Sequence, residues 1–127
     1  MSLSETHGIQ IEVEAQYVEE RSAPSDCYFF FAYHVRISNV GSESAQLMSR
    51  HWVITDADGQ AEEVRGPGVV GECPVLPPGA QFEYTSYCPL KTEVGSMHGA
   101  YQMVRASGDE FEATIAPFTL AVPNAVN

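Results

Sequence analysis

The amino-acid sequence predicts an all-β protein whose chain folds as an antiparallel sandwich of about seven or eight strands. Short segments alternate apolar with polar residues, turn motifs rich in Gly, Asn and Asp separate them, and no segment has the period of an amphipathic helix. A length of 127 residues suits one domain. We therefore expect residues 1–127 to form a single unit whose core spans about residues 9–122.

The N-terminal half contains three predicted strands, which are separated by a loop around Pro24 and by a turn that begins at Asn39. These strands cover residues 9–17, 28–38 and 47–55. The first alternates apolar and polar residues throughout, as expected of a strand with one buried face. In the third, we expect Met48, Trp52 and Ile54 to share one face, with Trp52 filling the core between two sheets.

The C-terminal half shows the same alternation, interrupted by tight turns at residues 56–59 and 107–109. Its predicted strands cover residues 60–64, 81–86, 101–105, 111–115 and 118–122, the last as a separate strand after Pro117. Residues 91–97 lack regular alternation, so we expect a loop there.

The charge balance excludes several classes of partner. The net charge is −11, with only six Lys and Arg side chains. Binding to nucleic acid or to an anionic membrane needs many cationic contacts, which this chain does not offer. The net charge does not exclude a compact anion such as a nucleotide as a ligand. A single Arg at contact distance can outweigh the negative charge of the rest of the chain, which salt screens. No segment reads as a signal peptide or a membrane span, and the three cysteines form no C-x-x-C pair, so we expect a cytoplasmic protein.

The segment after residue 64 carries the main functional signal. Gly66, Gly68 and Gly71 fit the G-x-G-x-x-G spacing of phosphate-binding loops, but the prolines that follow exclude the helix that a dinucleotide-binding fold requires. Two interpretations stay open for this glycine loop (residues 66–71). It is a tight turn between strands, or it is an anion nest of backbone N–H groups flanked by Arg50 and Arg65.

Metal and catalytic motifs are weak by comparison. The His, Asp and Cys residues show no paired-ligand spacing, and the Asp56-x-Asp58-Gly59 sequence lacks the remaining ligands of a calcium loop. There is no nucleophile motif, and the Ser96 and His98 pair has no evident acidic partner. We expect no metal site, no cofactor and no catalytic residue.

Four motifs together resemble the ApaG family. They are RHWVITD at residues 50–56, GPGVVG at residues 66–71, PG with YTS at residues 78–86, and GSMHGAYQM at residues 95–103. The resemblance implies a β-sandwich of the immunoglobulin or fibronectin type III kind. It also implies an association with cobalt tolerance and magnesium efflux, and it suggests protein interaction, the role supposed for related domains in F-box proteins and a polymerase-associated protein.

These observations favour a non-catalytic binding or adaptor module with an unidentified protein partner, as a monomer or a homodimer. The hypothetical ligand site consists of Arg50, Arg65, Gly66, Gly68 and Gly71. The alternative is a nucleotide or pyrophosphate binder with weak hydrolysis assisted by Mg²⁺. If the glycines serve binding rather than folding, we expect Gly68→Asp to leave the melting temperature nearly unchanged.

Overall fold

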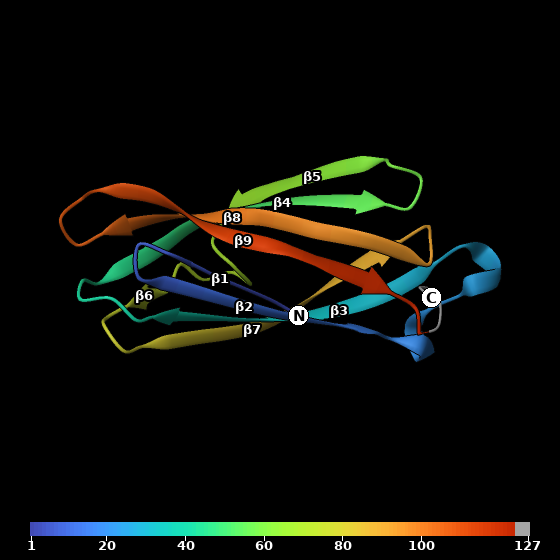
Figure 1. The fold of residues 1–127 in the computed structure, drawn as a ribbon, viewed down its shortest axis with the longest axis horizontal. Helices are drawn as coiled ribbons and strands as arrows, with labels where there is room; N and C mark the ends of the chain where they lie inside the picture. Colours follow the sequence, from blue (N-terminus) through green and yellow to red (C-terminus); the bar gives the residue numbers. More distant parts are fainter. Residues whose placement is uncertain (124–127) are drawn as a thin grey trace.

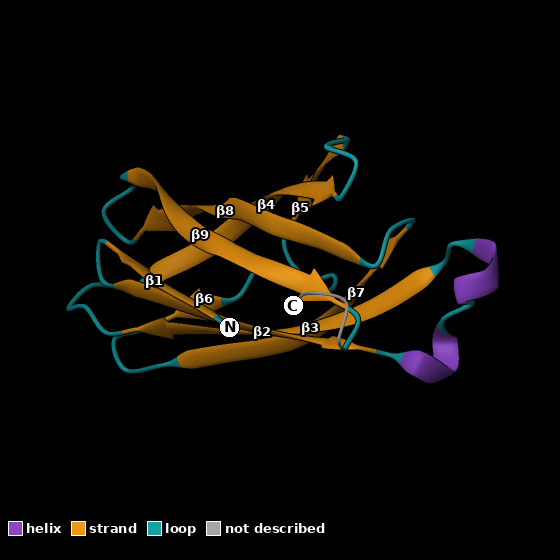
Figure 2. Ribbon diagram, turned by 45° about the vertical axis from the view of Figure 1, so that its right-hand side comes forward, coloured by secondary structure: helices purple, strands orange, loops and turns teal. Residues whose placement is uncertain are grey.

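A computed structural model describes residues 1–123, and its chain forms two antiparallel sheets packed face to face (Figure 1). The first sheet has the order β1-β2-β3-β7, and the second has the order β5-β4-β8-β9, with β6 paired to the beginning of β4. The strands are β1 (Ser2–Thr6), β2 (Ile9–Tyr17), β3 (Phe29–Asn39), β4 (Ala45–Asp56), β5 (Ala61–Pro67), β6 (Val75–Leu76), β7 (Gln81–Leu90), β8 (Val94–Arg105) and β9 (Glu110–Ala121). Two short 3-10 turns, Glu19–Arg21 and Pro24–Asp26, lie at one end of the sandwich (Figure 2).

The predicted antiparallel sandwich is confirmed, with nine strands among the described residues. Two strands were not predicted: β1 is short and largely polar, and β6 has only two residues. The prediction of a loop at residues 91–97 is wrong for its second half, since β8 begins at Val94. The separate last strand is also wrong, because β9 runs through Pro117 at an irregularity in its pairing with β8, where a proline costs no ladder hydrogen bond.

The core lies between the sheets, with Trp52 near its centre and only 2% exposed, as predicted. The prediction that Met48 shares the Trp52 face is wrong. The pairing of β4 with β8 shifts between Leu47 and Ser49, so one extra residue reverses the alternation of inward and outward side chains. Leu47 is therefore buried and Met48 exposed, whereas Trp52 points inward further along the same strand.

The two lateral sides of the sandwich differ. On one side, which we call the closed side, β1 and β2 contact β9. Thr114 N–H donates to Thr6 Oγ1 at 3.2 Å, and Arg105 donates to the His7 carbonyl at 2.8 Å. On the opposite side, which we call the open side, β5 and β7 are the edge strands and no comparable contact joins them within residues 1–123.

Candidate functional site

The glycine loop forms a tight turn at the edge of the second sheet. Val69 and Glu72 exchange two backbone hydrogen bonds of 2.8 and 2.9 Å, and Val70 and Gly71 between them have φ angles of +44° and +81°. Positive φ at both central positions is the pattern of a type I′ turn. Val70 is 56% exposed, and a β-branched residue in this region of φ is a strained outlier. The turn thus presents an apolar side chain in a fixed conformation.

Arg50 holds this loop against β4. Its Nη1 donates to the carbonyls of Pro67 and Gly68, each at 3.0 Å. Gly66 lies directly over the guanidinium group, so that a Cβ at this position would lie 2.9 Å from Nη2. A side chain at Gly66 would therefore displace the Arg50 guanidinium group from this position.

Gly68 has a structural role as well. Its φ is +58°, its N–H donates to the Met48 carbonyl at 2.9 Å, and a Cβ there would overlap the Glu72 carbonyl. The geometry therefore argues against the expectation that Gly68→Asp leaves the melting temperature nearly unchanged, and we expect this substitution to lower it. The N–H groups of Gly68, Val69 and Glu72 all donate to backbone carbonyls, and they are not directed toward an external anion.

Arg65 lies one residue away from this arrangement, on the other face of the sheet. It pairs in register with His51, whereas Arg50 pairs with Gly66 and shares the inward face of Trp52. Arg65 is 71% exposed at its side chain and lies 3.5 Å from Glu63, which also contacts His51 at 2.7 Å. These partners, His51 first, lower the pKa of the Glu63 carboxyl. Ligand binding by the five predicted residues remains a prediction.

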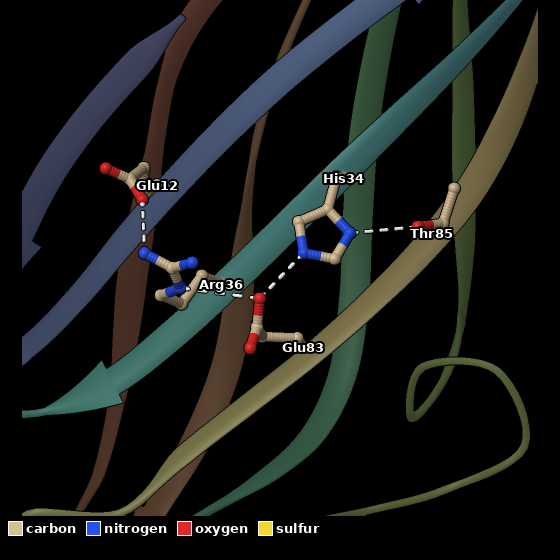
Figure 3. A network of polar contacts seen from close by, with 5 residues as sticks. All are labelled: Glu12, His34, Arg36, Glu83 and Thr85. Atoms are coloured by element: carbon tan, nitrogen blue, oxygen red, sulfur yellow. Dashed lines mark hydrogen bonds and ion pairs between the residues drawn. The ribbon is translucent and has the colours of Figure 1, made fainter.

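Figure 3 shows a polar network on the outer face of the first sheet, which the sequence did not reveal. His34 contacts Glu83 at 2.8 Å and Thr85 at 2.9 Å, and Arg36 lies within 3.4 Å of Glu83 and 3.1 Å of Glu12. The hydrogen bond from His34 lowers the pKa of the Glu83 carboxyl. All these groups are substantially exposed, so the network orders a surface without forming an enclosed site.

Other chemistry is sparse in the part of the chain that the structure describes. Within residues 1–123, no cluster of three or more His, Cys, Asp or Glu side chains could hold a metal ion, and no helix could span a membrane. All three cysteines are free, Cys27 and Cys73 exposed and Cys88 buried. Burial raises the pKa of the Cys88 thiol to about 11.

The fold and the glycine loop define the class of protein: a small two-sheet β-sandwich with a preformed turn at one sheet edge. The ApaG domain model matches residues 19–105, and the chain belongs to this family. It is 54% identical, over the full length of both chains, to Protein ApaG of Anaeromyxobacter dehalogenans strain 2CP-C. It is 53% identical to Protein ApaG of Pseudomonas aeruginosa strain LESB58 over 95% of this chain and 96% of that protein.

Solved structures agree with this assignment. The crystal structure of the ApaA protein from Bordetella pertussis matches with a TM-score of 0.90 and 51% identity, over 92% of this chain and 95% of that one. The C-terminal domain of wzt shares only the fold, with a TM-score of 0.56 and 11% identity, over 98% of this chain and 79% of that one.

Proposed function

We propose that this ApaG-family protein is a non-catalytic binding module of the immunoglobulin or fibronectin type III kind, acting in the cytoplasm. Its docking surface is the edge formed by β5 and the glycine loop, and its partner is a protein. The observation that carries the proposal is Val70, an exposed apolar side chain held at positive φ by a turn whose hydrogen bonds are already made. Local strain of this kind concentrates at functional sites.

The physical basis is preorganisation. The loop is fixed by the Val69–Glu72 hydrogen bonds and by Arg50, so a partner that contacts Val70 loses little entropy in ordering it. Three free cysteines suit a reducing compartment. The association of the family with cobalt and magnesium is explained in this proposal by the partner rather than by a metal site on this chain.

A pair of matched variants tests this function. Val70 and Val40 are 56% and 55% exposed, and Val40 lies in a different turn. Immobilised wild type, Val70→Asp and Val40→Asp are compared for the proteins they retain from an extract of the source organism, quantified by mass spectrometry. Asp tolerates positive φ, so Val70→Asp should fold, which a melting curve checks. We expect Val70→Asp alone to lose a specific partner; equal retention by all three would contradict the docking surface.

The alternative is a nucleotide or pyrophosphate site at the same edge. Arg50 and Arg65 both border a hollow there, together with Gly66 and Pro67, although Glu112 also lines it. Amide NMR titration with ATP and diadenosine tetraphosphate, with and without Mg²⁺, tests this alternative. Saturable shifts confined to Arg50 and residues 65–72 would support it. Phosphate release that survives both Arg50→Ala and Glu72→Gln would identify a contaminating enzyme.

A further inference from the structure

A pocket enters the sandwich from the open side, between β5 and β7. Its volume is about 160 Å³. The walls come from both sheets and include Tyr33, Trp52, Ile54, Val64, Ser86 and Met97. A cavity of about 150 Å³ accommodates a molecule the size of benzene, so this pocket can hold a small organic ligand rather than water alone.

The strand register orders the pocket from a polar end to an apolar end. Arg50 pairs with Gly66 on one side and Tyr101 on the other, whereas Ile54, four residues further along, pairs with Met97. Arg50 makes its end of the pocket polar, whereas Ile54 and Met97 make the other end apolar. Head and tail of a bound molecule would therefore meet different surroundings.

Arg50 is the cation of the polar end, and it has no acidic partner. The ion pairs within residues 1–123 do not include it, and its only side-chain hydrogen bonds there are those from Nη1 to two carbonyls. The side chain is half-buried in a chain with 17 acidic residues. Because a cation removed from water is stabilised by an opposite charge, the position favours an external anionic group.

Trp52 supplies a second, independent observation. Its indole Nε1 is buried and has no hydrogen-bond partner among the described residues, and the side chain lines the pocket. Buried donors are nearly always paired, because an unpaired one forfeits its hydrogen bond to water. The unpaired donor marks incomplete packing around the indole ring. Nε1 itself is covered by protein atoms, so a ligand in the pocket would lie against the ring.

We propose that this pocket binds a small organic carboxylate with a compact branched or cyclic apolar group. The carboxylate lies at Arg50, and the apolar group lies toward Ile54 and Met97 along the Trp52 ring. The reverse orientation is disfavoured because Glu62, which pairs in register with Ile54, places a negative charge near Cys88 at the apolar end. The pocket does not include Val70, although Arg50 both lines the pocket and holds the glycine loop.

The probe is isovalerate, with neutral isovaleramide as the control for charge. Trp52 is the only tryptophan, so its indole N–H gives a single, resolved resonance in an amide NMR spectrum. We expect isovalerate to shift this resonance saturably with a dissociation constant of about 1–10 mM, as suits so small a ligand. Isovaleramide should bind about tenfold more weakly or not at all. A stationary indole resonance would overturn the proposal, leaving a hydrated cavity.

Matched variants locate the binding. Arg50→Gln and Arg65→Gln each remove one positive charge, but only Arg50 borders the pocket, so only the first should weaken isovalerate binding, by about tenfold or more. Since Arg50→Gln also loosens the glycine loop, Val64→Phe fills the pocket with Arg50 retained, and it should abolish binding. Equal weakening by Arg65→Gln, or binding that survives Val64→Phe, would overturn the assignment. Val70→Asp should leave isovalerate binding intact.

Discussion

The two lateral sides of the sandwich are finished in different ways. On the closed side, β1 packs against β9. Arg105 donates a hydrogen bond to the His7 carbonyl, and its guanidinium carbon lies 4.5 Å from the centre of the Phe111 ring. On the open side, the sheets separate around a pocket, which Arg50 lines without an acidic partner among residues 1–123. Each side has one buried polar atom without a hydrogen-bond partner among the described residues, Ser2 Oγ on β1 and Trp52 Nε1 on β4. Each also has a non-glycine residue at positive φ, His7 and Val70, so the pocket is what distinguishes the open side.

The largest expected difference between the sides is in packing energy. Ile115 on β9 is 1% exposed, so we expect Ile115→Ala to lower the free energy of unfolding by about 3–4 kcal/mol through lost transfer energy and a residual cavity. Val64 on β5 is only partly buried, so Val64→Ala should cost about 1 kcal/mol. Urea unfolding of both variants measures the two costs. Equal losses would mean that the open side is packed as tightly as the closed one.

The buried tyrosines beside the pocket should make the free energy of unfolding depend on pH in the alkaline range. Burial is the main cause that raises the pKa of the Tyr33, Tyr84 and Tyr101 hydroxyls above their ordinary value. A raised pKa contributes stability that is fully present below about pH 10 and is lost as the pH rises from there toward the folded-state pKa. We expect stability to fall above this pH, because the unfolded chain then releases protons that the buried hydroxyls keep.

Urea unfolding at increasing alkaline pH measures this loss, and absorbance near 295 nm follows tyrosine ionisation. The control is Tyr101→Phe, which removes one titrating hydroxyl and should make stability fall less steeply. A slope unchanged in Tyr101→Phe would show that this hydroxyl ionises as readily in the folded protein as in the unfolded chain.

Alternation predicted most of the strands because one face of each is buried: the predicted 9–17 strand coincides with β2. It could not reveal the extra residue at Met48, since a bulge leaves no mark in apolar periodicity. The inward position of Arg50 could have been predicted from the sequence, because Arg50 lies two residues before Trp52 on the same strand. The pocket was not, because it depends on how far two sheets separate, which no local pattern specifies.

A smaller effect is expected at the edge of the open side. Asn adopts positive φ more readily than Val, so Val70→Asn should relieve strain and raise the free energy of unfolding by up to about 1 kcal/mol. Val40 has similar exposure and no positive φ, so Val40→Asn should give no such gain. Chemical denaturation measures both variants. A loss of stability in Val70→Asn would mean that packing of the valine outweighs its backbone strain.

The smallest effect on stability is expected on the outer face of the first sheet, which belongs to neither lateral side. His34 and Glu83 form their contact in solvent, where attraction is screened and side-chain ordering offsets it. We expect His34→Ala and Glu83→Gln to leave unfolding by urea at neutral pH within the error of the measurement. Because contact with His34 lowers the pKa of Glu83, any contribution is present above the ordinary carboxyl pKa and is lost as the pH falls through the lowered value. A clear loss at neutral pH in both variants would mean that the surface network, and not only the packing between the sheets, stabilises the first sheet.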